Sequence, residues 1–175
     1  MRIGVPRENE EGEKRVALTP DVAVKMQKLG FDISMESGAG ADASYADEEY
    51  EKAGVEIIKD PKELWGNSDI ILKVRPPKAH PELGFNGVEL MKKDQTIISF
   101  LYPAMNPEML QEMADHGINA LAMDSVPRIS RAQKMDALSS MANIAGYRAV
   151  VEAAQHFGRF FTGQITAAGR INPAK

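Results

Sequence analysis

Apolar and polar positions divide the chain into short and long segments that alternate from the first residue onward. The short apolar runs have the length of buried strands and lie at residues 1–5, 31–35, 55–58, 69–74, 96–101 and 118–123. Between them, apolar residues recur with helical spacing, as Val22, Met26 and Leu29 do at i, i+4 and i+7. This alternation predicts an α/β fold of flavodoxin- or Rossmann-like type, a parallel sheet with helices on both faces.

Local signals mark where the helices begin and end. Thr19 followed by Pro20 predicts a capped helix start, and Asn106 begins a second signal of the same kind. Gly30 marks a helix end. The longest helix is predicted over residues 137–157, where a stripe of small residues favours packing in the core.

The last stretch of the chain differs in composition from the rest. Residues 162–175 contain Gly, Thr, Asn and Pro without a helical stripe, which is typical of a linker. We therefore expect one lobe over residues 1–161, followed by a linker that leads to a domain outside this sequence.

Composition excludes several classes of protein. The net charge is −4 and cysteine is absent, which argues against non-specific nucleic-acid binding, disulfides and thiolate chemistry. No apolar run reaches the ~18 residues of a membrane span. His80, His116 and His156 are isolated from one another in sequence, so no metal site is expected.

Two glycines and two basic residues are the first candidates for ligand binding. Gly38 and Gly40 match a loose dinucleotide fingerprint, but no helix starts promptly after them, so a plain turn is the favoured interpretation. Lys73 lies near the end of an apolar strand, where parallel sheets bind ligands. Lys73 is compatible with two roles. Its ammonium group could bind an anion, or its aliphatic side chain could cover the sheet while the ammonium group reaches water. Arg15 lies in a charged loop, where a solvated surface role is the default.

The polar segment 124–136 is the most informative, because it joins a predicted strand to the start of the longest helix. Arg128 and Gln133 offer donors for amide or phosphate oxygens, and Asp136 offers an acceptor for an amide NH₂. Asp136 and Ser139 also fall where a helix N-terminus takes capping residues, and capping alone explains those two.

Five stretches carry a resemblance to a known family: residues 1–8, 15–20, 36–40, 71–74 and 128–147. In this order they resemble the alanine dehydrogenase/pyridine nucleotide transhydrogenase family over essentially the whole chain. The last stretch is the most specific. It is similar to the NAD(H)-binding component in the proton-translocating NAD(P) transhydrogenase branch of the family. This component is domain I of the alpha subunit, and the chain resembles the N-terminal lobe of that domain.

The resemblance implies direct hydride transfer between NADH and NADP⁺, coupled to proton movement across a membrane. It implies that Arg128, Gln133 and Asp136 are catalytic by orienting the nicotinamide, and that these three and Ser139 bind NAD(H). Tight NAD(H) binding is expected to need the absent Rossmann domain, so the lobe alone is expected to be inactive.

The resemblance also implies partners and a location. The partners are an NADP(H)-binding domain, which carries NADP(H), and a membrane domain, and the chain is expected to form a homodimer. The expected location is peripheral, on the cytoplasmic side of the inner membrane or on the matrix side in mitochondria.

One departure bears on the choice within the family. In the alanine dehydrogenase branch a catalytic histidine stands where this chain has Tyr102, and a phenol with a pKa of about 10 is a poor acid–base substitute at neutral pH. Arg15 and Lys73 match that branch's carboxylate-binding pair, but the transhydrogenase pattern keeps both. The alternatives are an alanine-dehydrogenase-like lobe of an NAD-dependent enzyme and a non-catalytic α/β assembly module.

Overall fold

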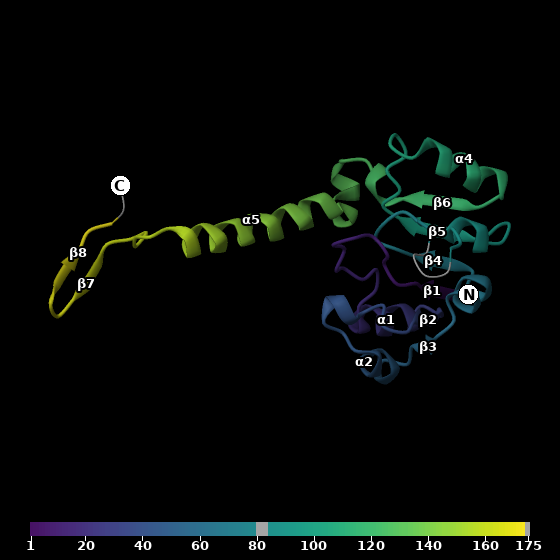
Figure 1. Cartoon of the computed structure of the whole chain (residues 1–175), viewed down its shortest axis with the longest axis horizontal. Coiled ribbons are helices and arrows are strands. Elements are labelled where there is room, and N and C mark those ends of the chain that lie inside the picture. Colours follow the sequence, from purple (N-terminus) through teal and green to yellow (C-terminus); the bar gives the residue numbers. More distant parts are fainter. Residues whose placement is uncertain (80–83, 174–175) are drawn as a thin grey trace. The chain divides into compact units, whose positions relative to one another are not determined.

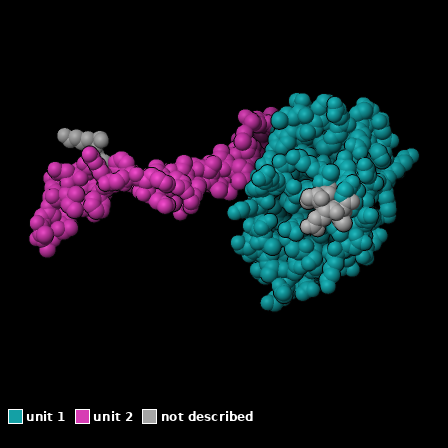
Figure 2. Space-filling view, viewed as in Figure 1, with its two compact units in different colours: residues 1–126 teal, residues 127–175 magenta. Residues whose placement is uncertain are grey.

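The computed structural model describes residues 1–79 and 84–173. The chain divides into two compact units, Met1–Val126 and Pro127–Lys175 (Figure 2). The first unit contains the sheet, and the second contains the long helix and a hairpin. His80 lies outside the described residues.

Within the described residues of the first unit, six strands form a single sheet (Figure 1). They are β1 (Arg2–Val5), β2 (Asp32–Glu36), β3 (Glu56–Ile58), β4 (Ile70–Leu72), β5 (Thr96–Ser99) and β6 (Asn119–Ala122). All neighbouring pairs are parallel, in the order β3-β2-β1-β4-β5-β6, which confirms the predicted parallel sheet. The order reverses between β1 and β4, and sheets of this type bind ligands outside the carboxyl ends of the strands at such a point.

Helices connect these strands where the sequence pattern placed them. They are α1 (Pro20–Gln27), α2 (Asp47–Lys52), α3 (Pro61–Asn67) and α4 (Pro107–Asp115), with 3-10 turns at Ala41–Ala43, Gly87–Leu90 and Met123–Ser125. Thr19 and Asn106 occupy the N-cap positions, but neither side chain caps its helix, contrary to the prediction. The backbone oxygen of Thr19 accepts the first helical bonds, and the Asn106 amide donates backward to the oxygen of Leu101 at 2.9 Å.

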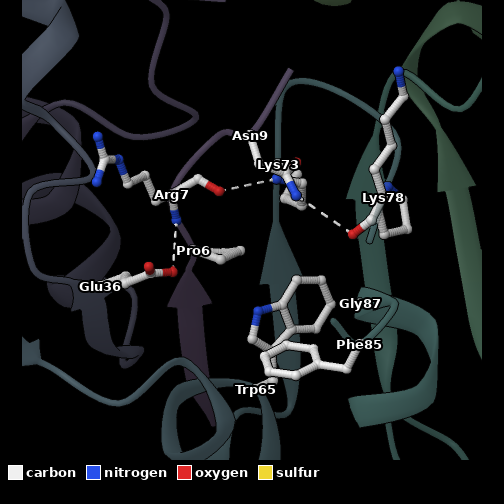
Figure 3. Close-up of a pocket in the computed structure, with 10 residues that line it drawn as sticks. Pro6, Arg7, Asn9, Glu36, Trp65, Lys73, Lys78, Phe85 and Gly87 are labelled. Atoms are coloured by element: carbon white, nitrogen blue, oxygen red, sulfur yellow. Dashed lines mark hydrogen bonds between the residues drawn. The ribbon is translucent and has the colours of Figure 1, made fainter. Parts of the chain in front are cut away.

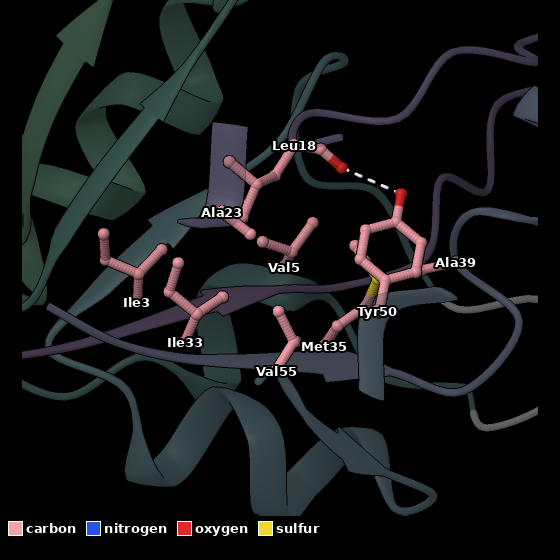
Figure 4. Close-up of a cluster of buried hydrophobic side chains, with 9 residues drawn as sticks. All are labelled: Ile3, Val5, Leu18, Ala23, Ile33, Met35, Ala39, Tyr50 and Val55. Atoms are coloured by element: carbon pink, nitrogen blue, oxygen red, sulfur yellow. Dashed lines mark hydrogen bonds between the residues drawn. The ribbon is translucent and has the colours of Figure 1, made fainter. Parts of the chain in front are cut away.

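The two faces of β1 show how the sheet is covered. Ile3 and Val5 point into a cluster with side chains from α1 and α2, including the fully buried Tyr50 (Figure 4). Gly4, between them, faces the other side, where an added Cβ would lie 2.1 Å from Oγ of Ser68 at the end of α3. Helices therefore cover both faces, as predicted.

A second cluster of buried side chains fills the space around β4 and β5. Its members come from α3, α4, β4, β5, the 3-10 turn at Gly87–Leu90 and adjoining loops, and are Trp65, Ile71, Val88, Met91, Ile97, Leu101, Met113 and Ile118. The two clusters give the first unit its own core. The loops that follow the carboxyl ends of the strands, called the carboxyl edge below, are therefore anchored on a rigid base.

The second unit begins with a 3-10 helix, Ser130–Met135, followed by α5 (Ala137–His156). Helix α5 matches the predicted bounds within one residue, but none of its residues is buried, so the core role predicted for its small residues is wrong within this chain. The segment predicted as a linker contains an antiparallel hairpin of β7 (Gln164–Thr166) and β8 (Gly169–Ile171).

The sequence did not predict this hairpin, because its strands are exposed and lack the apolar run of a buried strand. Its turn is stabilised locally, since Oγ1 of Thr166 accepts from the amide of Ala168 at 3.2 Å and Gly169 adopts a φ of +132°. The linker role of residues 162–175 stays a prediction, and residues 174 and 175 lie outside the described part.

Candidate functional site

Lys73 directly follows β4 at the point where the strand order reverses. Its side chain is buried, and Nζ lies 3.2 Å from Oε2 of Glu8 and 3.3 Å from the backbone oxygen of Arg7. The alternative in which its ammonium reaches water is therefore wrong. The carboxylate that Lys73 contacts belongs to the chain itself, at Glu8.

Glu8 ties the loop after β1 to the end of β4. One carboxylate oxygen accepts from the amide of Val74 at 2.6 Å, and the other accepts from the amide of Arg75 at 3.2 Å. Such bonds to an ionised acceptor are strong in a buried setting. Sequence reasoning missed Glu8, although an acidic residue just after a strand, facing a lysine just after a neighbouring strand, was a usable signal.

Arg15 is held in a second ion cluster. Its Nε and Nη2 donate to the two oxygens of Glu13 at 2.7 and 2.6 Å, and Nε of Arg75 donates to the same carboxylate at 2.7 Å. The hydrogen bond from Arg15 is the main cause that lowers the pKa of Glu13 to about 2, and burial opposes it. The same bond raises the pKa of Arg15. Both residues that were expected to form a substrate pocket are thus paired with internal carboxylates.

Tyr102 follows β5 and lies close to this cluster. Its phenol oxygen is 3.5 Å from Nη1 of Arg75. The structure therefore groups Arg15, Glu13, Arg75 and Tyr102 at the carboxyl edge, where the sequence had indicated only Arg15 and, separately, the unusual Tyr102.

A small cavity lies beside Lys73, among Trp65, Phe85 and the loop after β1 (Figure 3). Its volume is about 20 Å³, which is room for roughly one water molecule. Among the described residues that line it, Asn9 has a buried side-chain oxygen without a hydrogen-bond partner, so a partly apolar wall carries one unpaired polar atom. A nucleotide does not fit in it.

The glycine pattern at residues 38–40 is a turn. The amide of Gly38 donates to Asp47 at 2.9 Å, and Ser37 donates to the same carboxylate at 2.7 Å. A Cβ on Gly40 would lie 2.5 Å from the ring of Tyr50, so this glycine is required by packing. The amide that a phosphate would need is already occupied, which agrees with the interpretation as a plain turn.

The second unit places Arg128, Gln133, Asp136 and Ser139 around the start of α5. Asp136 caps the helix: one oxygen accepts from the amides of Leu138 and Ser139, and the other accepts from Oγ of Ser139 at 2.6 Å. The Ser139 hydroxyl is the main cause that lowers the pKa of Asp136, while Arg128 adds a smaller attraction. Arg128 and Gln133 are exposed. Capping explains the placement of Asp136 and Ser139, and the side chains of the other two face solvent.

The described residues contain neither a metal-binding cluster nor a membrane-spanning helix. Across residues 1–79 and 84–173, no group of three or more His, Asp or Glu side chains is placed to hold a metal ion. In the same part of the chain, no helix is both long and apolar enough to cross a membrane.

The strand order, the covered faces and the charged carboxyl edge define a Rossmann-like α/β lobe. The chain belongs to the alanine dehydrogenase/PNT family, whose N-terminal domain it matches over residues 4–145. This confirms the resemblance carried by the five sequence stretches.

Individual relatives place the chain within this family. It is 55% identical over its whole length to the NAD(P) transhydrogenase subunit alpha of Cereibacter sphaeroides, of which it covers 32%. It is 34% identical over 155 residues to the alanine dehydrogenase of Bacillus subtilis, which corresponds to 89% of this chain and 38% of that one. The transhydrogenase crystal structure from Sinorhizobium meliloti superposes with a TM-score of 0.86 at 37% identity, covering 99% of this chain and 50% of the other. The chain thus spans about a third to a half of these proteins, and alanine dehydrogenase is the more distant relative.

Proposed function

We propose that this chain is the N-terminal lobe of the NAD(H)-binding component of a proton-translocating NAD(P) transhydrogenase. The observation that carries the proposal is the 55% identity to a transhydrogenase alpha subunit over all 175 residues, against 34% to an alanine dehydrogenase. NADH supplies the hydride when bound, and NADP⁺ on a partner domain receives it.

The residues around the start of α5 have the chemistry to hold a nicotinamide. A carboxamide offers one acceptor oxygen and two N–H donors. The exposed Arg128 and Gln133 offer donors, and the partly buried Asp136 offers an acceptor. Asp136 and Ser139 are already fixed to each other by a 2.6 Å hydrogen bond, so this part is preorganised. In this proposal the four residues orient the ring, and the rate gain comes from positioning.

The carboxyl edge of the first unit argues against the alanine-dehydrogenase-like alternative. Lys73 and Arg15, the pair that would hold a substrate carboxylate, are each within 3.2 Å of an internal carboxylate. Tyr102 contacts Arg75 at the same edge, and a phenol is a poor general acid–base group at neutral pH. These contacts favour a lobe that holds no amino-acid substrate.

The proposal extends to partners and location. The chain would work with an NADP(H)-binding domain and a membrane domain, as a homodimer, and would lie at the cytoplasmic side of the inner membrane or the matrix side in mitochondria. Tight NAD(H) binding would need the Rossmann domain, so hydride transfer is tested in a larger protein.

A chimeric alpha subunit tests this function. Residues 1–175 replace the matching N-terminal part of the Cereibacter sphaeroides subunit, and hydride transfer from NADH to an NADP⁺ analogue is measured with the partner subunit present. We expect the chimera to be active. Gln133→Leu and Asp136→Asn should slow transfer much more than they weaken NADH binding, and Asn at position 136 retains the cap.

Lys134→Gln, in the same 3-10 helix, is the matched control and should leave both quantities unchanged. Equal losses of transfer rate and of NADH affinity in the two variants would contradict the positioning role. An inactive chimera that nevertheless folds and binds its partner would contradict the proposed function itself.

A further inference from the structure

Asn86 and Gly87, between β4 and β5, form the only Asn-Gly pair in the sequence. The backbone nitrogen of the residue after an asparagine can attack the side-chain amide, and glycine hinders this attack least because it has no Cβ. A bond forms between the nitrogen of Gly87 and Cγ of Asn86, the Cγ–Nδ2 bond breaks, and Nδ2 leaves as ammonia. Water then opens the succinimide ring to aspartate or isoaspartate, so water is the only co-reactant.

The packing around Gly87 requires a glycine at this position. The residue is buried, and an added Cβ would lie 2.8 Å from the ring of Trp65 and 3.0 Å from Cβ of Pro77 (Figure 3). A larger residue here would have to displace the indole ring or the proline. The core therefore imposes the reactive pair on the sequence.

Two hydrogen bonds hold the side chain of Asn86. Its Oδ1 accepts from the amide of Val88 at 3.2 Å and caps the 3-10 turn Gly87–Leu90. Its Nδ2 donates to Oε2 of Glu112 in α4 at 3.3 Å. Attack on Cγ requires the plane of the side-chain amide to turn toward the nitrogen of Gly87, and both hydrogen bonds oppose that rotation. The contact with Glu112 therefore slows the reaction.

Either product of the reaction weakens the attachment of the turn to α4. An aspartate at position 86 keeps an acceptor for the amide of Val88, but it has no N–H for Glu112, so two carboxylates face each other where the amide now donates. Isoaspartate adds a methylene group to the backbone directly before Gly87, where the ring of Trp65 leaves no room.

We propose that Asn86 is a site of spontaneous deamidation, that its contact with Glu112 sets the rate, and that the product releases the turn Gly87–Leu90 from α4. Asparagine is one of the thermolabile residues, and local opening of the turn exposes it to the reaction. This modification does not depend on hydride transfer, and it can fail while the proposed function stands.

The test incubates the folded chain at mildly alkaline pH and follows the tryptic peptide 79–92 by mass spectrometry, which detects the exchange of NH₂ for OH. The wild type should accumulate the product with time. Glu112→Ala should react at least about threefold faster, because one of the two restraints is lost. Glu108→Ala removes the same charge from an exposed position of α4 and should react at the wild-type rate. Asn86→Ser retains a capping residue and should give no product in this peptide.

A second measurement tests the effect of the product. Asn86→Asp should lower the melting temperature and alter the fluorescence of Trp65, the only tryptophan in the chain. Adding Glu112→Gln removes the facing charge and should recover at least about half of the lost melting temperature, relative to Glu112→Gln alone. The proposal is overturned if the peptide stays unmodified in both the wild type and Glu112→Ala, if these two react at equal rates, or if Asn86→Asp melts as the wild type does.

Discussion

Replacing Glu13 by Gln should lower the stability of the first unit in a strongly pH-dependent way. The substitution removes the carboxylate that Arg15 and Arg75 share, and leaves two guanidinium groups with a neutral partner. The pKa of Glu13 falls from 4.5 to about 2 on folding. At 1.36 kcal/mol per unit this corresponds to about 3 kcal/mol, which the exposure of both arginines reduces to about 2 kcal/mol.

The pH dependence has a definite sign. A carboxylate whose folded-state pKa is lowered stabilises the protein above its unfolded-state value, and this stabilisation is lost as the pH falls toward 2. We therefore expect the wild type to exceed E13Q by about 2 kcal/mol at pH 7, with the difference shrinking below about pH 4.5. Urea denaturation of both proteins over a series of pH values measures this.

A control in the same loop separates the ion cluster from a general charge effect. Glu11 is exposed, and Glu11→Gln removes the same formal charge, so its effect at pH 7 should be within about 0.5 kcal/mol. A stability difference between the wild type and E13Q that stays constant from pH 7 to pH 3 would refute the reasoning.

Two further substitutions test the core beneath the site. Tyr50→Phe removes the hydroxyl that donates to the buried oxygen of Leu18 at 2.9 Å, and should cost about 1–2 kcal/mol, seen as a lower melting temperature. The same burial raises the pKa of Tyr50 to about 12, so no tyrosinate absorbance from this residue is expected at pH 10. Gly40→Ala places a Cβ 2.5 Å from the Tyr50 ring and should lower the melting temperature markedly, whereas Gly66→Ala in α3 meets no atom within 4 Å and should not.

Much of the fold could be predicted because the apolar pattern is dictated locally. The strands of the parallel sheet were found from short segments rich in apolar residues, which a buried strand such as β1 needs. The helix starts at Pro20 and Pro107 were found from proline, whose fixed φ suits the first turn. The hairpin in residues 162–175 was not predicted, because its strands are exposed and lack an apolar run.

The candidate site was predicted only in part. The segment around Arg128 and Asp136 was proposed as a site from its position before a long helix, and that role stays a prediction. The cap at Asp136 is a local interaction that spacing predicts. The pairings of Lys73 with Glu8 and of Arg75 with Glu13 join residues 65 and 62 positions apart, and no local pattern encodes them.

The sequence by itself determined the α/β class, the family and the candidate loop before α5, because each rests on residue order and local spacing. The tertiary structure alone decided that the basic residues at the carboxyl edge already hold internal carboxylates, and that Tyr102 lies against Arg75. The physical reason is that parallel strands bring the ends of distant segments to one edge, and only there do opposite charges come within hydrogen-bonding distance.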